Sequence, residues 1–360
     1  MMRACVLGMI AGLSLPWGAG AQEAHSGLDA RAVVSVEGAA SNVLTAAPRF
    51  GDAGVGAYRV VVYPVWKINE NWAVTGTLQS YSRPYFTESF SSVGHGIEDN
   101  ILQGTVNYSR VSDKGSVLAR VGELSTAFGS FMVHYDDADN ALIAMPLEYG
   151  YYYKPVTTLG LTGAQVDATR GKWDGRVQFA NASPANPRSL FGHDQYGNWA
   201  GGAGYTVKQG LRVGVSGYRG PYLSKNYAFY FPGELPPSKL NAHGVGVDVA
   251  WATGHWNVQG EWQKFVMPYT VIPDFHTEAA YGEAKRVLSP RWYVAGRAGY
   301  THASFAGYTE SYEGVVGWRP NRLQVLKVGY ELRHGTAAPV NGSSVVVQLV
   351  TSVPLFSWAR

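Results

Sequence analysis

The chain has 360 residues, of which only 15% are charged, while 44 are glycine and 13% are aromatic. Typical globular proteins have about 25% charged residues and ~7% glycine, so this composition is not that of an ordinary soluble enzyme. A formal net charge of +3 gives no electrostatic support for a nucleic-acid partner.

The N-terminus has the features of a secretory signal peptide. Arg3 supplies a positive start, "ACVLGMIAGLSL" is a short apolar run, and "AGA" ending at Ala21 matches a small-residue cleavage site. We therefore expect residues 1–21 to be the signal and residues 22–360 to form the mature domain. The single cysteine, Cys5, lies in the signal, so the mature chain would contain no disulfide.

Alternation of apolar and polar residues dominates the rest of the chain. In "HWNVQGEWQ", Trp256, Val258, Gly260 and Trp262 share one face, and the residues between them are polar. A period of two over about ten residues predicts strands with one apolar and one polar face. About sixteen such segments begin near Leu28, Gly56, Trp72, Ile101, Ser116, Leu159, Trp173, Gly197, Leu211, His243, Trp256, Thr277, Arg291, Glu310, Arg322 and Ser343.

The connections between these segments alternate between short and long. Short turns such as "NEN", "SDKG", "RGK" and "TGH" are suited to joining adjacent antiparallel strands. Longer connections cover Ser41–Val55, Ala127–Thr158 and Gly220–Ala242. Since no apolar window after the signal is long enough for a membrane-spanning helix, this pattern predicts an all-β transmembrane antiparallel up-and-down barrel with short periplasmic turns and long external loops.

The positions of tryptophan favour the same architecture. Seven tryptophans flank short turns on the apolar face of their strands, as expected for an aromatic girdle at a membrane interface. A soluble sandwich or propeller is the alternative, but the post-turn positions are unevenly spaced, unlike propeller blades. The seven are Trp66, Trp72, Trp173, Trp251, Trp256, Trp292 and Trp318.

This layout resembles the sixteen-stranded porins of Gram-negative outer membranes over nearly the whole mature chain. "RVGELSTAFGSF" (Arg120–Phe131) is similar to the strand-to-loop entry of the phosphate-selective porin O/P group. The resemblance implies an outer-membrane location, a lipid-bilayer environment, passive diffusion of small hydrophilic solutes and a homotrimer. The C-terminal strand departs from the family pattern, because Ala359 and Arg360 follow the last aromatic residue.

If the apolar faces point to lipid, the alternate side chains line a water-filled lumen. Charged residues are expected there, either paired with one another or acting as an electrostatic ladder that favours anions slightly. The predicted lumen wall includes Arg59, Arg120, Arg176, Arg212, Arg297, Lys327, Glu261 and Glu331.

The longest connection, Ala127–Thr158, is the third external loop, which in general porins folds into the channel and forms its constriction. By that resemblance we expect loop carboxylates to face wall arginines across a narrow water path, which creates a transverse field. The tyrosines would stack on sugars or pack the loop against the wall. The predicted constriction residues are His134, Asp136, Asp137, Asp139, Glu148, Tyr151, Tyr153 and Lys154.

Two other chemistries are weaker matches. Asp137, Asp139 and Glu148 fit three positions of a calcium-binding EF-hand loop, but Ala141 and Leu142 replace its required oxygen ligand and glycine. "HAS" at His302–Ser304 looks like the His-x-Ser pair of outer-membrane phospholipases, but that family's following asparagine is missing. We therefore expect no cofactor, no metal and no enzymatic activity. The alternatives to a porin are a non-conducting structural or adhesion barrel and, less favoured, a lipid-modifying enzyme.

Overall fold

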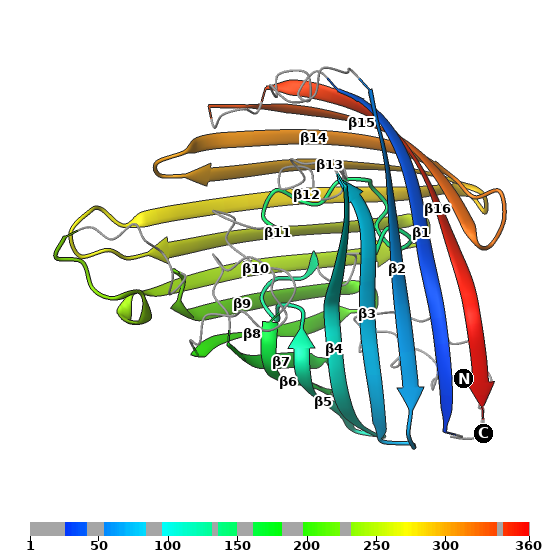
Figure 1. Cartoon of the computed structure of the whole chain (residues 1–360), viewed down its shortest axis with the longest axis horizontal. Helices are drawn as coiled ribbons and strands as arrows, with labels where there is room; N and C mark the ends of the chain where they lie inside the picture. The colour runs from blue at the N-terminus through cyan, green and yellow to red at the C-terminus, as the bar shows by residue number, and fades with distance from the viewer. Residues whose placement is uncertain are drawn as a thin grey trace.

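The chain forms a closed antiparallel β-barrel of sixteen strands in the computed structural model (Figure 1). The structure describes residues 26–41, 54–83, 96–131, 136–149, 161–181, 197–223, 232–336 and 341–359. The predicted signal peptide lies outside these residues. Each strand pairs with its neighbours in sequence, and β1 pairs with β16 to close the barrel. The fold class predicted from alternation is confirmed.

The strand bounds are close to those predicted, including the two with the least regular apolar faces, β6 and β12. The largest difference is in β4, which begins at Gly96 instead of near Ile101. The residues before Ile101 do not alternate regularly between apolar and polar side chains, so the sequence pattern did not mark them as strand. The strands are β1 (Gly27–Ser41), β2 (Gly54–Lys67), β3 (Trp72–Arg83), β4 (Gly96–Ser112), β5 (Gly115–Leu124), β6 (Leu161–Arg170), β7 (Trp173–Asn181), β8 (Gly197–Lys208), β9 (Leu211–Pro221), β10 (Asn241–Thr253), β11 (Trp256–Met267), β12 (Phe275–Ser289), β13 (Trp292–Ala303), β14 (Gly307–Trp318), β15 (Gln324–Gly335) and β16 (Gly342–Ala359).

A single turn of 3-10 helix, η3 (Pro237–Lys239), lies in the connection between β9 and β10. Among the described residues, no helix is both long and apolar enough to cross a bilayer.

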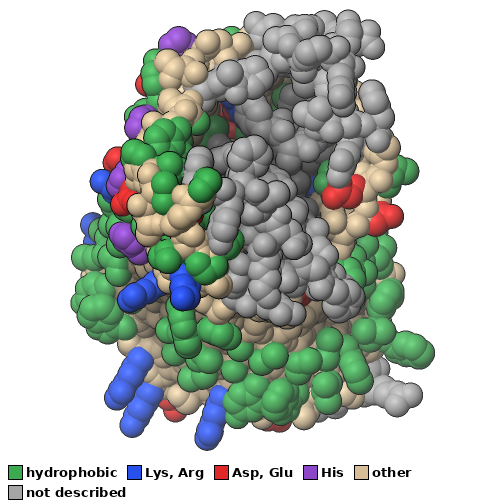
Figure 2. Space-filling view, turned by 60° about the vertical axis from the view of Figure 1, so that its left-hand side comes forward, with side chains coloured by type: hydrophobic (Ala, Val, Ile, Leu, Met, Phe, Trp, Pro, Cys, Tyr) green, Lys and Arg blue, Asp and Glu red, His purple; other side chains and the backbone are tan. Residues whose placement is uncertain are grey.

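Burial alternates along the strands as the sequence predicts. On β10, Val245, Val247 and Val249 are exposed on the outer face, while Asp248 between them is buried in the interior. Hydrophobic side chains cover much of the outer surface in Figure 2, and lysines and arginines gather at one edge. An outer face of this composition is suited to hydrocarbon, and the polar inner face is not.

The seven predicted tryptophans all lie at the short-turn end of the barrel and on its outer face. Six of them are exposed over at least 37% of their surface, and Trp318 is half-buried. Trp292 and Trp318 stack on adjacent strands with ring centroids 6.0 Å apart. Trp358 on β16 pairs with Leu28 at the same end and is the most exposed tryptophan of the described chain, at 73%. It belongs with the seven, although no short turn marks it in the sequence.

The interior of the barrel contains two large apolar clusters instead of a single core. One surrounds Leu142 and Ile143, and the other surrounds Phe128, Phe131 and Tyr149. All five residues belong to the connection between β5 and β6. The barrel therefore packs its buried apolar residues against an inserted loop.

Candidate functional site

The described part of the connection between β5 and β6 lies inside the barrel and follows its wall. We call its described residues, 125–131 and 136–149, the inner loop. At its start, Gln178 on β7 donates to the Ser125 carbonyl at 2.7 Å and accepts from the Ala127 N–H at 3.1 Å. Arg176, also on β7, donates to the Gly129 carbonyl. These contacts direct the chain inward as soon as β5 ends.

Glu261 on β11 forms the second anchor of the inner loop. Its carboxylate accepts from the Ser130 N–H at 2.9 Å and from the Tyr149 hydroxyl at 2.7 Å. Burial, together with the nearby Glu261 carboxylate, raises the pKa of Tyr149 well above its ordinary value, so this hydroxyl stays a donor. Gly129 has a φ of 75°, and a Cβ there would lie 2.0 Å from the Tyr149 hydroxyl. Only glycine fits this close approach.

Arg297 and Glu313, on β13 and β14, hold the middle of the inner loop. The Glu313 carboxylate accepts from the N–H groups of Ile143 and Ala144 at 2.8 and 3.0 Å. Arg297 donates to the Ala144 carbonyl at 2.8 Å and pairs with Glu283 at 2.8 Å. Wall side chains therefore bond both the N–H groups and the carbonyl group of the loop backbone here, which satisfies the hydrogen-bonding needs of buried peptide groups.

Asp137 is the centre of the fourth anchor, on β1, β2 and β15. It forms an ion pair with Arg59 at 2.5 Å and accepts from the Ser35 hydroxyl at 2.5 Å. Lys327 donates to the backbone carbonyls of Asp137 and Leu142 at 2.6 and 3.0 Å. The side chains of Arg59 and Asp137 are each only 1% exposed, so this pair is shielded from water.

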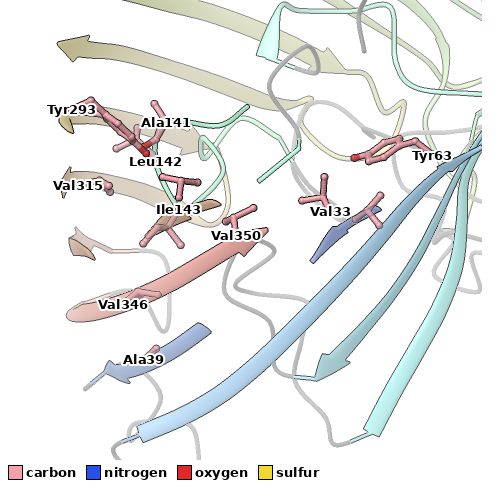
Figure 3. Packing of buried hydrophobic residues seen from close by; sticks show 13 residues of the cluster. Val33, Ala39, Tyr63, Ala141, Leu142, Ile143, Tyr293, Val315, Val346 and Val350 are labelled. Carbon is pink, nitrogen blue, oxygen red and sulfur yellow. The ribbon is translucent and has the colours of Figure 1, made fainter. Parts of the chain in front are cut away.

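Apolar packing adds to these polar contacts. Figure 3 shows Leu142 and Ile143 of the inner loop close to Val315, Val346 and Val350 of the wall. Tyr293 on β13 belongs to the same cluster and donates to the Ala141 carbonyl at 3.1 Å. Side chains of the barrel interior are apolar here because they contact the loop instead of water.

This geometry corrects the predicted arrangement of loop and wall charges. We expected the loop carboxylates to face wall arginines across a water path, but Asp137 touches Arg59, and Asp136 pairs directly with Arg31 at 3.0 Å. The loop lies against this part of the wall, which leaves no room for water between the paired groups. Arg59, Arg297 and Lys327, predicted to line the open lumen, are covered by the loop.

The other predicted constriction residues have different surroundings. Glu148 is completely buried. Asp139 remains partly exposed, and its pKa is raised by burial and by the neighbouring Asp136 carboxylate. His134, Tyr151, Tyr153 and Lys154 lie outside the described residues.

The wall arginines Arg120 and Arg212 form ion pairs and keep part of their side-chain surface exposed. Arg120 and Asp167 pair at 2.7 Å, and each side chain is 23% exposed. Arg212 pairs with Asp174 at 2.7 Å and with Asp248 at 2.5 Å. Glycines on the strands beside Arg212 make room for it, since a Cβ at Gly204 would lie 2.1 Å from its guanidinium.

Glu331, the last predicted wall residue, pairs with Arg333 at 2.6 Å on the same strand. Among the predicted wall residues, Arg120, Arg212, Arg297 and Glu331 pair with other charges of the wall, whereas Arg59, Arg176, Glu261 and Lys327 bond to the loop. Sequence reasoning missed three anchors: Ser35, Gln178, and Ser216 on β9, whose hydroxyl accepts from the Gly129 N–H at 3.2 Å. They are uncharged and face inward, and the alternation of their strands is the only signal that marks them.

The two weaker chemistries find no support in the described part of the chain. No group of three or more His, Cys, Asp or Glu side chains is placed there to hold a metal ion. Asp137, the first residue of the EF-hand match, is occupied by Arg59 and Ser35. The Ser304 hydroxyl accepts from the backbone N–H of His276 at 3.0 Å, which is a structural role.

No family model matches the sequence, and no curated protein matches it. Solved structures do match the fold. An anion-selective porin from Comamonas acidovorans gives a TM-score of 0.59 at 12% identity, covering 92% of this chain and 100% of that one. OmpF of Salmonella typhi, in complex with daunomycin, gives 0.61 at 10% identity, covering 90% and 97%. The trimer form of OmpT, an outer-membrane protein of Vibrio cholerae, gives 0.57 at 9%, covering 91% and 99%.

These similarities show that the chain has the sixteen-stranded barrel fold of Gram-negative outer-membrane porins. At such low identity they concern the fold alone. The similarity of Arg120–Phe131 to phosphate-selective porins is not confirmed by them.

Proposed function

We propose that this protein is an outer-membrane porin that lets small hydrophilic solutes diffuse passively, without enzymatic activity. The observation that carries the proposal is a closed sixteen-stranded barrel with an apolar outer face, a charged interior and an inserted loop. Eight strands are enough for side chains to fill a barrel, whereas 16–18 strands leave an aqueous channel. A signal peptide over residues 1–21 would direct residues 22–360 to that membrane.

Within the barrel, we propose that solutes pass beside the wall around Arg120 on β5 and Arg212 on β9. The described inner loop bonds to β1, β2, β7, β9, β11, β13, β14 and β15. Arg120 and Arg212 keep exposures of 23% and 18%, whereas Arg59 and Arg297 keep 1% and 2%. Only charges that retain exposed surface can act on a passing ion.

The two exposed arginines suggest weak selectivity. Arg120 has an aspartate partner and Arg212 has two, so neither site has an excess of positive charge. The slight anion preference expected from the sequence gains no support from these sites. The similar Comamonas acidovorans protein is an anion-selective porin, which keeps that preference as a proposal to be measured. We also propose a homotrimer, because the similar Vibrio cholerae protein has a trimer form.

The first test is electrical. Purified full-length protein added to a planar bilayer should produce stepwise conductance increases in both low and high salt, and the heat-denatured protein should produce none. Its reversal potential in a salt gradient measures ion preference.

A non-conducting barrel is the second candidate, and the many anchors of the inner loop favour it. Correctly folded protein that inserts without any conductance steps, in any salt, would support that barrel and reject the porin.

A further inference from the structure

The outer surface of the barrel has a histidine-rich region at the end opposite the tryptophans. Of the five histidines in the described chain, four lie on outer faces near the long-connection ends of β10, β12, β13 and β15, and all four are exposed. Figure 2 shows histidine side chains gathered along one side of the molecule. With four charged side chains on the same strands and on β9, β11 and β14, they form what we call the histidine belt: Arg219, His243, Lys264, His276, Glu278, His302, Glu310 and His334.

The strand register places several side chains of the histidine belt directly opposite one another. Arg219 lies opposite His243 across β9 and β10, and Lys264 lies opposite Glu278 across β11 and β12. Glu278 in turn lies opposite His302. One strand further, Glu310 lies opposite His334. Side chains directly opposite each other in a sheet are neighbours, so each carboxylate of the belt has a histidine beside it.

The height of the histidine belt matches the second boundary of a bilayer. On β10, His243 is separated from Trp251 by eight residues with exposed valines on the outer face, and on β13 His302 is separated from Trp292 by ten residues. With a rise of ~3.3 Å per residue and a strand tilt near 40°, these separations are roughly 20–25 Å along the membrane normal. The apolar band of an outer-membrane barrel is about 25 Å tall. If the tryptophans mark one headgroup region, the histidine belt lies in the other.

The charge of the histidine belt depends on the protonation of its histidines. Arg219 and Lys264 balance Glu278 and Glu310, so the belt is neutral when its histidines are neutral and has a charge of +4 when they are protonated. Asp274, in the connection before β12, adds one carboxylate above the belt, where it accepts from the Tyr269 N–H at 3.2 Å. Histidine is the side chain that ordinarily changes charge between pH 5 and 8.

We propose that the histidine belt is a pH-dependent binding surface for the anionic phosphate headgroups of the surrounding lipid. An ordinary girdle at this height needs only tyrosine and tryptophan, which are present here as Tyr300, Tyr308 and Trp262. Trp262 donates to Glu278 at 2.8 Å, and the Tyr308 ring lies 6.3 Å from that of His334. The belt adds a switchable positive charge to this aromatic setting. With its histidines protonated, it would hold a shell of anionic lipid around β9 to β15.

Lipid headgroups fit the histidine belt better than a metal ion does. The histidines stand on four different strands with other side chains between them, and no metal-binding group of three is formed in the described chain. A row of separate charges matches many headgroups side by side. The proposal depends on the barrel being embedded in a membrane, as proposed above, but not on its conducting.

The test measures which lipid contacts the barrel. Full-length protein is reconstituted in phosphatidylcholine vesicles containing spin-labelled phosphatidylglycerol, whose phosphodiester stays anionic from pH 5 to 8. Electron paramagnetic resonance gives the motionally restricted fraction, with spin-labelled phosphatidylcholine as reference. A positive charge at an anionic surface contributes about 1 kcal/mol, which is roughly a five-fold change in binding. We expect the association of phosphatidylglycerol relative to phosphatidylcholine to rise at least two-fold between pH 7.5 and 5.5.

Three variants separate the histidine belt from other charges. Replacing His243, His276, His302 and His334 together by asparagine should abolish the rise with acid. His255→Asn, at the exposed turn between β10 and β11, is the matched control and should leave it intact. Glu278→Gln with Glu310→Gln should raise the association already at pH 7.5, a gain that loss of folding cannot imitate.

The outcomes are decisive for the histidine belt. An unchanged association between the two pH values, a rise that survives the four asparagines, or a rise lost in His255→Asn would each overturn the proposal. If acid changes the oligomeric state in native electrophoresis and leaves lipid association unchanged, the belt is a contact between copies of the chain instead. A protein that conducts in a planar bilayer but fails the lipid test would lose this inference and keep its proposed function.

Discussion

The two sides of the barrel interior contain the same kinds of ion pair in opposite surroundings. At the Asp137 anchor, Arg59 and its partner are 1% exposed and are covered by the inner loop. Farther around the wall, on β5 and β6, Arg120 and Asp167 are both 23% exposed and belong to the wall itself. Removing one partner from an arginine–aspartate pair costs far more free energy when the pair is shielded from water than when it is exposed. The first pair is thus suited to holding the loop, and the second to meeting solutes.

The difference in burial leads to the prediction with the largest effect. Asp137→Asn leaves Arg59 buried without a full counter-charge, and breaking a buried pair costs about 3–5 kcal/mol. We expect this cost to weaken loop docking, so single-channel conductance should become larger and noisier, and the midpoint of denaturant unfolding should fall. Planar-bilayer recording and tryptophan fluorescence measure the two effects.

Asp167→Asn is the matched control for Asp137→Asn. It removes the same charge from a pair that water already screens, which is worth about 0–1 kcal/mol. The unfolding midpoint and the size of the conductance steps should stay near those of the wild type. Equal effects of the two substitutions would contradict the assignment of one pair to the loop and the other to the solute path.

A smaller effect is expected from Arg120→Gln, which sharpens the comparison on the exposed side. Removal of this charge leaves Asp167 exposed to passing ions, so the reversal potential should shift toward cation preference. Unit charges 4 Å apart in water interact by about 1 kcal/mol, so the permeability ratio should change by roughly two- to five-fold.

Arg286→Gln removes the same charge from the outer face, where Arg286 lies 5.2 Å from the centre of the Trp256 ring. Because it does not face the lumen, the ratio should not change. If Arg286→Gln shifts the reversal potential as much as Arg120→Gln does, Arg120 is not part of the solute path.

The sequence predicted the fold well because a strand with two different faces leaves its period in the residue pattern. Trp256 to Gln263 alternates throughout, and the structure places the tryptophans outside and Glu261 inside. Turn residues such as those around Gly254, with a φ of 53°, marked the strand ends equally clearly. Local chemistry was enough for these features.

The arrangement of the inner loop was not predictable in the same way. Asp137 and Arg59 are far apart in sequence, and their contact depends on which wall strand the loop reaches once inside. No local period records that choice. The anchors Ser35 and Gln178 were missed for the same reason, since an inward serine or glutamine looks like any other lumen residue. The sequence identified the loop and its acids, but it placed them across water from the arginines that they contact.

The smallest predicted effect concerns the contact between two connections, the one between β9 and β10 and the one between β11 and β12. This polar contact lies outside the barrel and can be compared with those inside it. Glu234, between β9 and β10, accepts from the N–H groups of Thr270 and Val271 at 2.9 and 3.0 Å, and from the Thr270 hydroxyl. Desolvation acts to raise the pKa of Glu234, but these hydrogen bonds outweigh it and lower the pKa from 4.5 to about 2. A carboxyl group with a lowered pKa contributes stability that is fully present above pH 4.5 and is lost as the pH falls through 2.

Hydrogen exchange at Thr270 and Val271, corrected for intrinsic rates, tests this contact. Protection should be constant between pH 7 and pH 5 and should decline only below about 4.5, where Glu234 begins to lose its folded-state advantage. Glu234→Gln keeps an acceptor but removes the charge, so protection should fall a few-fold at pH 7, since hydrogen bonds to charged groups are roughly twice as strong as neutral ones. Conductance should not change, because the contact lies outside the lumen. Protection already lost at pH 5, or unaffected by Glu234→Gln, would show that the carboxylate does not hold the two connections together.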